Sequence, residues 1–383
     1  MEHDDFILML PGPTDVPKET LEAMRRRMIN HRADEFRRLH EQVLEKVRKV
    51  LGATSGDVYV LTCSSTGGIE CAVSNLIDRE DRVLAFVNGL FAERMTVAAE
   101  YYSDYVIRVE NELGTAVTVE EFRKEVESTN GIDVALIVHN ETSTGAFNPS
   151  VQEISEYCRK QGIVLIVDGV TSIGGYPLEL SKWGVTAFVG GTQKCLAAPP
   201  GLAIVHVSEE AREKIRKKPK RPHYFDLVSH EEFMKRLETP FTPAITLFYG
   251  LDASLDYILE RGLERWYAAH RQGSTAFYEA LEEMNLRVFP RQQFRSRTLI
   301  AARLPDGVQD VQLTKLMKEK YGVLISGGMG KTKGLIIRIG NMGLVTPDRV
   351  ARTIRALSKS LAELGVEFGE VDVDQIVRRA FSG

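Results

Sequence analysis

The stretch Gly162–Leu196, GIVLIVDGVTSIGGYPLELSKWGVTAFVGGTQKCL, contains two short apolar runs that each lead into a charged group. Ile163–Val167 is followed at once by Asp168, and Ala187–Gly191 is followed by a polar segment that ends in Lys194. Apolar runs of this length, bounded by polar residues, predict buried strands. Because a buried charge costs free energy unless it has a partner, an acid and a lysine at two strand ends predict a shared ligand site.

A ligand that uses a carboxylate and a lysine amine together would explain both charges. Pyridoxal phosphate has this property, since its aldehyde forms a Schiff base with a lysine and its ring nitrogen takes a carboxylate partner. The alternative is a structural ion pair between Asp168 and Lys194 that binds nothing. Polar residues after the other predicted strands help to decide between the two interpretations.

Composition excludes several classes of protein. The chain has 383 residues, enough for two domains or one large domain with a smaller attachment. Its net charge of −4 gives no electrostatic footprint for nucleic acid, and no apolar run approaches the roughly 18 residues of a membrane span. The start, MEHDDFILMLPGP, has acids where a signal peptide needs basic residues. The four cysteines form no CxxC pair, so we expect a cytoplasmic protein without a metal site.

Strand, loop and helix patterns alternate over the first half of the chain. The strands are continuous apolar runs, which predicts a mostly parallel sheet covered by helices on both faces. Ligands of such sheets bind beyond the carboxyl ends of the strands. Polar clusters follow five predicted strands, at residues 63–68, 88–91, 139–145, 168–172 and 192–194. The predicted strands are Asp57–Thr62, Arg82–Val87, Tyr105–Glu110, Val134–Val138, Ile163–Val167, Ala187–Gly191 and Leu202–Val207.

The pattern changes in the last third of the chain. A long helical region, Ala244–Met284, is followed by short predicted strands and two helices, which indicates a smaller α+β domain. The strands are Leu286–Phe289, Thr298–Arg303, Val323–Ser326 and Gly334–Ile339, and the helices Val311–Tyr321 and Pro347–Leu364. We expect an N-terminal arm at residues 1–14, a large cofactor-binding domain at 15–261 and a small C-terminal domain at 262–383.

Three motifs each allow a functional and a structural interpretation. Ser64–Thr66 offers backbone N–H groups and hydroxyls to an anion, or simply caps a helix. Phe91 stacks on a flat ligand or belongs to the core. Arg338 interrupts the apolar run LIIRIG, either as a fork for a carboxylate or as an edge-strand arginine that faces water.

Two further segments invite a nucleotide or nucleic-acid interpretation that we do not favour. The basic run Lys214–Arg221, KIRKKPKR, predicts a solvated face or loop in a chain of net negative charge. Gly327–Thr332, GGMGKT, superficially suggests a phosphate-binding loop. However, Ile325 occupies the position of its first glycine and a strand follows instead of a helix, so we predict a glycine-rich hairpin.

Taken in order, the motifs resemble one known family over nearly the whole chain. They are PGPT, SSTGGIE, NGLF, HNETSTG, VDGVTSIGG, GGTQKCLAAPPG, TPFTPAITL and GGMGKTKGLIIRIGNMG. This set is similar to the class V aminotransferases among the fold-type-I pyridoxal phosphate enzymes, especially the alanine–glyoxylate and serine–pyruvate group. The resemblance implies a large domain with a mostly parallel seven-stranded sheet and a smaller C-terminal α+β domain.

The resemblance also implies roles for individual residues. Lys194 would form the Schiff base with pyridoxal 5'-phosphate, and Asp168 would pair with its ring nitrogen. Arg338 would bind the substrate α-carboxylate, with Gly12 close to the substrate, and Phe91 would stack on the ring. The remaining cofactor-binding positions would be Ser65, Thr66, Gly67, Thr142 and Gln193, with Thr239 and Thr242 contributed by the partner subunit of a homodimer.

The implied reaction is a ping-pong transamination between serine or alanine and pyruvate or glyoxylate. Arg295 and Arg297 are candidates for a second clamp that would admit a dicarboxylate. Other activities of the same scaffold stay open, namely 2-aminoethylphosphonate or phosphoserine transamination, a cysteine desulfurase-like lyase, and a non-catalytic pyridoxal phosphate-binding subunit. Against the lyase, all four cysteines lie at or before position 195.

Overall fold

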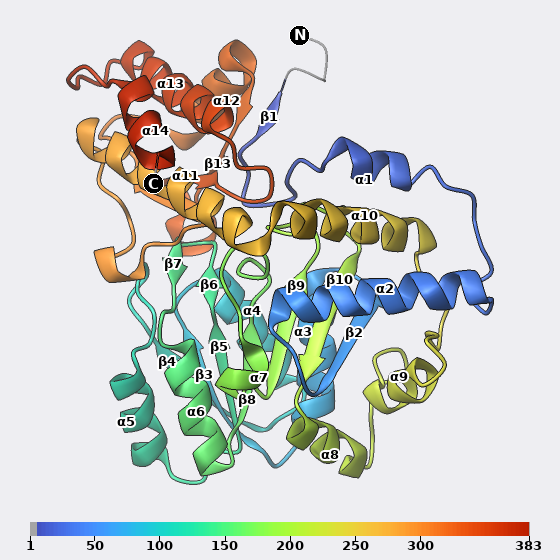
Figure 1. Ribbon diagram of the computed structural model, residues 1–383. Helices are drawn as coiled ribbons and strands as arrows, with labels where there is room; N and C mark the ends of the chain where they lie inside the picture. Colours follow the sequence, from blue (N-terminus) through green and yellow to red (C-terminus); the bar gives the residue numbers. More distant parts are fainter. Residues whose placement is uncertain (1–5, 383) are drawn as a thin grey trace.

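The computed structural model describes residues 6–382, and its main feature is a seven-stranded sheet with a C-terminal domain at one end (Figure 1). The strand order is β2-β10-β9-β8-β5-β3-β4. Only β10 runs antiparallel to its neighbours, so the carboxyl ends of the other six strands meet at one edge and the predicted sheet is confirmed. Its strands are β2 (Asp57–Thr62), β3 (Arg82–Val87), β4 (Tyr105–Glu110), β5 (Val134–Val138), β8 (Val164–Asp168), β9 (Ala187–Gly191) and β10 (Leu202–Val207).

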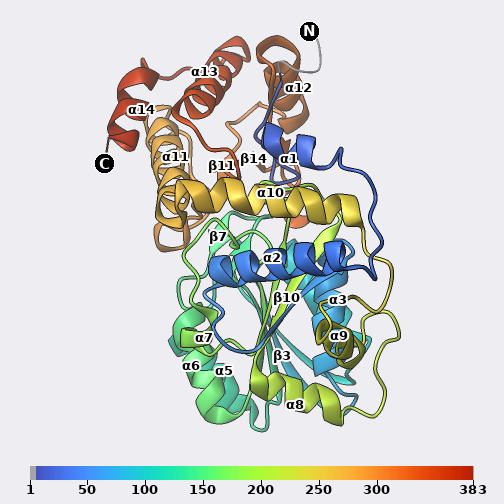
Figure 2. The ribbon, with the colours of Figure 1, turned by 45° about the vertical axis from the view of Figure 1, so that its right-hand side comes forward.

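Helices cover both faces of this sheet (Figure 2). Six of the strands are largely buried between two apolar cores, which is why they read as continuous apolar runs, whereas the edge strand β4 is partly exposed. One face carries α3 (Ser65–Leu76), α4 (Leu90–Glu100) and α8 (Glu209–Lys217), with α9 (Leu227–Met234) beside them. The other carries α2 (Asp34–Leu51), α5 (Val119–Thr129), α6 (Val151–Gln161), α7 (Leu180–Trp183) and α10 (Ile245–Arg261).

The N-terminal segment connects the two parts of the molecule. Its strand β1 (Ile7–Leu8) pairs with β12 (Val323–Leu324) of the C-terminal domain. The following helix α1 (Lys18–Ala23) packs on α10. The first five residues of the predicted arm lie outside the described residues.

The C-terminal domain is α+β, as predicted, and has its own apolar core. Its sheet order is β11-β14-β13, with α11, α12, α13 and α14 packed around it. The bounds are α11 (Leu263–Glu283), β11 (Leu299–Arg303), α12 (Asp310–Tyr321), β13 (Ser326–Gly327), β14 (Ile336–Gly340), α13 (Pro347–Glu363) and α14 (Val373–Phe381). Gly262 alone separates α10 from α11, and the exact division into domains stays a prediction.

Two strand predictions for this domain are wrong, and one of the two interpretations of Arg338 is excluded. Leu286–Phe289 forms only an isolated bridge at Val288, because Pro290 follows and cannot donate to a ladder. Val323–Ser326 is split, since β12 pairs with β1 whereas β13 pairs with β14. Arg338 lies in β14, the middle strand, and is only 7% exposed, so it is not an edge residue facing water.

The glycine-rich segment after β13 forms the predicted hairpin. It contains a short 3₁₀ helix, Gly330–Thr332, and leads into β14, which runs antiparallel to β13. Within residues 6–382, none of the helices has the length and apolar character that a membrane span requires.

The close approach of α3 to the sheet depends on Gly68. A Cβ atom at this position would lie 2.9 Å from the side chains of Ala203 and Val189. We predict that Gly68→Ala lowers the free energy of unfolding by about 1–3 kcal/mol, because a packed interface must open. Urea denaturation measures this, with Gly369→Ala, where no atom lies within 4 Å, as the control. Equal stability of the two variants would contradict the prediction.

Candidate active site

A pocket of about 140 Å³ lies at the sheet edge where the parallel strands end. It brings together seven of the residues predicted for the site, which come from segments after β2, β3, β5, β8 and β9. They are Ser65, Thr66, Phe91, Thr142, Asp168, Gln193 and Lys194. The five polar clusters of the sequence therefore surround one cavity.

Asp168 and Lys194 are buried in this pocket without a direct ion pair. Asp168, the last residue of β8, accepts a hydrogen bond from the Val170 backbone N–H at 2.9 Å. The Lys194 amine donates instead to the carbonyl of Pro11. Burial raises the pKa of Asp168 to about 7 and lowers the pKa of Lys194 to about 8. Two costly charges that do not neutralise each other directly are better explained by a ligand than by a structural ion pair.

The start of α3 faces the same pocket. Ser64 caps the helix by accepting from the Gly67 N–H at 3.3 Å, and the Gln193 side-chain amide donates to the Ser65 hydroxyl at 2.9 Å. Gly67 itself does not line the cavity. Because a helix N-terminus attracts negative charge, this corner of the pocket suits a phosphate group.

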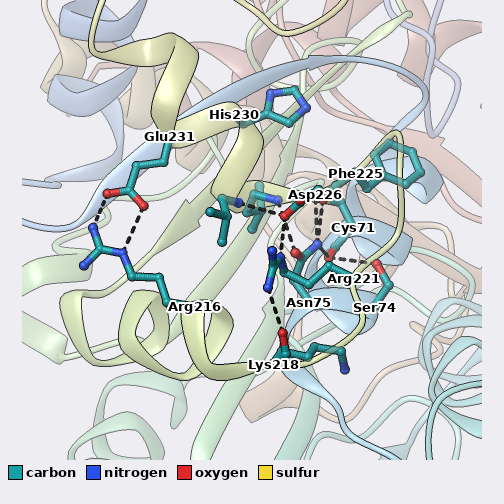
Figure 3. Close-up of polar contacts among 12 residues, drawn as sticks. Cys71, Ser74, Asn75, Arg216, Lys218, Arg221, Phe225, Asp226, His230 and Glu231 are labelled. Atoms are coloured by element: carbon teal, nitrogen blue, oxygen red, sulfur yellow. Dashed lines mark hydrogen bonds and ion pairs between the residues drawn. The ribbon is translucent and has the colours of Figure 1, made fainter.

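The other end of α3 is fixed by a polar cluster (Figure 3). The Asn75 side chain donates to the Phe225 carbonyl at 2.7 Å and accepts from the Leu227 N–H at 3.2 Å. Asp226, between them, accepts from the Arg221 guanidinium at 2.7 Å. The chain from Arg221 to Leu227 thus holds α3 at the end remote from the pocket.

The basic run 214–221 is largely a solvated helix end and loop, as predicted, since Arg216, Lys217 and Lys220 are exposed. Lys218 is the exception. Lys218 is only 8% exposed and forms an ion pair with Asp78 at 2.9 Å. Arg216 binds Glu231, as Figure 3 shows. The acidic partners Asp78 and Glu231 lie outside the run, so the charge pattern within the run could not predict these ion pairs.

Arg338 and Gly12 do not line the cavity but contact residues that do. The Arg338 guanidinium donates to the carbonyls of Gly327 at 2.8 Å and Thr142 at 3.2 Å. It has no ion-pair partner within the described chain, and burial lowers its pKa to about 10. Gly12 has a φ of +101°, and a Cβ there would lie 2.4 Å from the Lys194 amine, so only glycine fits.

Four other candidates lie away from this pocket. Thr239 donates its hydroxyl to the Phe241 carbonyl at 2.7 Å, and Thr242 is exposed. Arg295 pairs with Glu282 at 2.8 Å, and Arg297 lies 5.5 Å from the Tyr176 ring centre. None of the four lines the cavity of its own chain.

Asn140 and Arg94 are among the pocket-wall residues that sequence reasoning missed. Asn140 donates its amide to the hydroxyls of Thr171 and Thr298, at 2.8 and 3.0 Å. Arg94 stands 5.2 Å from the Phe91 ring centre. Their signals were present, since Asn140 belongs to the HNETSTG motif and Arg94 follows Phe91 at the spacing that puts both on one helix face.

The pocket fits pyridoxal phosphate by its chemistry. It combines an anion-binding helix end, an aromatic side chain, a buried carboxylate and a buried lysine amine with a lowered pKa. Among residues 6–382, no group of three or more histidine, cysteine or acidic side chains is arranged to hold a metal ion.

Comparisons with known proteins agree with this chemistry. Residues 8–350 match the family described as aminotransferase class-V. The chain is 37% identical to an uncharacterized aminotransferase of Methanocaldococcus jannaschii, over 96% of each chain. It is 32% identical to the L-aspartate–glyoxylate aminotransferase of Paracoccus denitrificans, over 94% of this chain and 92% of the relative. It is 30% identical to the serine–glyoxylate aminotransferase of Arabidopsis thaliana, over 94% and 90%.

A solved structure extends the similarity to three dimensions. The alanine–glyoxylate aminotransferase from Nostoc sp. superposes with a TM-score of 0.88 at 29% identity, covering 93% of this chain and 95% of the other.

The lowered pKa of Lys194 predicts an unusual reactivity. In cofactor-free protein, reductive methylation of Lys194 should rise with pH around an apparent pKa near 8, because burial favours the neutral amine. Mass spectrometry of the Lys194 peptide measures this, with Lys160 as an internal check on the reagent. Asp168→Asn should lower this pKa further, since the Asp168 charge favours the ammonium form. A midpoint at the ordinary lysine value of 10.5 would contradict the prediction.

Proposed function

The chain belongs to the class V aminotransferases, a family that uses pyridoxal phosphate, and from this premise we propose that it transfers the amino group of serine or alanine to glyoxylate or pyruvate. The observation that carries the proposal is the pocket in which Lys194 and Asp168 are buried without pairing. Beside it, Arg338 is buried without a carboxylate partner.

Bound pyridoxal phosphate supplies an aldehyde for the incoming amine and a ring that accepts the electrons of the substrate carbanion. Asp168 would keep the ring nitrogen protonated, because a carboxylate favours a cation beside it. The Lys194 amine would take the proton from the substrate Cα and return a proton to the cofactor carbon that carried the aldehyde. A pKa near 8 leaves part of this amine neutral at physiological pH, as a general base requires.

Arg338 binds the substrate α-carboxylate, and its guanidinium is already oriented by the carbonyls of Gly327 and Thr142. Phe91 would stack on the ring, and Thr142 would contact the ring hydroxyl. The start of α3 would hold the phosphate, through Ser65, Thr66, Gly67 and Gln193.

Thr239 and Thr242 complete the phosphate site of a second copy in a homodimer. What supports this is their position on a loop that does not line the pocket of its own chain, with Thr242 exposed. The active sites would then be shared between the subunits.

A small neutral donor suits the charge of the site, because the two arginines considered as a second clamp lie outside the pocket. Arg94 favours aspartate as a second candidate donor, because its guanidinium is in the pocket wall and forms no ion pair within the described chain. A phosphonate or phosphoserine donor would also have to use Arg94.

The other activities have less support. A desulfurase needs a mobile nucleophilic thiol, whereas Cys195 is fully buried and burial raises its pKa to about 12. A non-catalytic pyridoxal phosphate-binding subunit would leave Arg338, the proposed clamp for a substrate carboxylate, without a use.

A panel of donors tests the reaction. With pyridoxal phosphate present, serine and alanine should convert glyoxylate and pyruvate to amino acids with parallel double-reciprocal plots, the mark of ping-pong kinetics. Lys194→Ala should reduce turnover by at least about 10²-fold, since the general base is lost. Undiminished transamination by Lys194→Ala, or no transfer from any donor, would refute the proposal.

Two arginine variants distinguish the donors. Arg338→Met should raise KM about tenfold or more for every donor, because each has an α-carboxylate. Arg94→Met should raise KM for aspartate alone if aspartate is a substrate. Steady-state kinetics with serine, alanine and aspartate measure both. An Arg338→Met enzyme with unchanged KM values would contradict the assigned clamp.

A further inference from the structure

Glu141 is a buried carboxylate that none of the proposed steps uses. It is the second residue of β6 (Asn140–Glu141), which pairs with β7 (Ala146–Phe147), and it is 0% exposed. One oxygen accepts from the backbone N–H groups of Phe91 and Ala92, both at 3.0 Å. The other accepts from the N–H and hydroxyl of Ser143, at 2.9 and 2.6 Å.

Glu141 takes the place of a local cap for α4. The N-cap residue is Gly89, which has no side chain to bind the first N–H groups of the helix. A Cβ at Gly89 would lie 2.4 Å from the Glu141 side chain, so glycine is required to admit the carboxylate. The Ser143 hydroxyl also accepts from the Leu90 N–H at 2.9 Å. The turn between β6 and β7 therefore holds three consecutive N–H groups, those of residues 90–92.

The geometry suits an ionised carboxylate. Each oxygen accepts two hydrogen bonds, and a protonated acid would turn its own hydrogen toward a donor. Burial raises the pKa of Glu141, while the bonds from Ser143, Ala92 and Phe91 oppose this shift. Negative charge is also favourable at the N-terminus of α4.

The same carboxylate acts electrostatically on Asp168 and on Arg338. Its charge raises the pKa of Asp168 and opposes the lowering of the pKa of Arg338. Arg338 in turn donates to the carbonyl of Thr142, the residue directly after Glu141. Glu141 thus connects the segment that carries Phe91 to the segment that carries Thr142.

We propose that Glu141 is a positioning residue, whose carboxylate fixes the Phe91 ring against the cofactor by tying the first turn of α4 to the β6–β7 turn. A serine cap would satisfy the helix at lower desolvation cost, but it would not join these two segments. The inference rests on the proposed function, since it takes Phe91 as the residue that stacks on the cofactor.

Glu141→Gln tests this role. Glutamine keeps one acceptor oxygen but places an NH₂ group against backbone N–H donors on its other side. We expect the dissociation constant of pyridoxal phosphate from the cofactor-free protein to rise about tenfold or more. The circular dichroism band of the bound cofactor should also change.

A double-mutant cycle separates positioning from a general loss of structure. Phe91→Ala should weaken cofactor binding, and adding Glu141→Gln to it should change the dissociation constant less than twofold, because Glu141 acts through Phe91. Additive effects of the two substitutions would overturn the proposal.

Matched variants complete the design. Glu121→Gln makes the same substitution in the cap of α5, where Glu121 accepts from the N–H and hydroxyl of Thr118, and should leave cofactor binding unchanged. If Glu141→Gln does not fold, Ser143→Ala removes one donor to Glu141 and the acceptor of the Leu90 N–H, and it should weaken binding in the same direction by less. Unchanged binding in Ser143→Ala would then overturn the proposal.

The readout also separates this inference from the function on which it rests. Cofactor binding is measured without substrates, so a wild-type protein that binds no pyridoxal phosphate refutes the proposed function. A wild-type protein that binds it, together with a Glu141→Gln protein that binds it equally well, refutes only the role of Glu141.

Discussion

The arrangement depends on holding opposite charges in the protein interior without letting them neutralise each other directly. Asp168 ends β8 and Lys194 follows the neighbouring parallel strand β9, yet the amine donates to the Pro11 carbonyl and the carboxylate accepts from the Val170 N–H. A direct ion pair would lower the cost of burial but would occupy both groups. Their separation keeps each available for a different part of one ligand.

Parallel strands make this separation possible. Their carboxyl ends lie at one edge, and each following segment enters the pocket from its own direction. The helix N-termini contribute the partial positive charge of their free N–H groups. The start of α3 faces the cavity, whereas the first N–H groups of α4 bind the carboxylate of Glu141, which lies in another segment. Rigid packing behind α3, from Gly68 to the Asn75 cluster, keeps the start of α3 directed at the site.

Local patterns were sufficient for the sheet and for most of the pocket. The bounds of β3, β5 and β9 could be read from apolar runs because both of their faces are buried. What could not be predicted has a different cause. The environments of Lys218, Arg338 and Glu141 depend on residues far away in the chain, namely Asp78, Thr142 and the first turn of α4. Hydropathy and spacing within a window carry no information about such partners.

The N-terminal segment has a mechanical consequence. Residue 9 is bonded to Leu324 and Gly340 of the C-terminal domain, and α1 is packed on α10 beyond it. Pro11 and Gly12, which touch Lys194, lie between these two anchors. The segment is therefore held at both ends. A rotation of the C-terminal domain would shift the backbone of Pro11 and Gly12 relative to Lys194, and domain motion would then change how freely the lysine side chain can move.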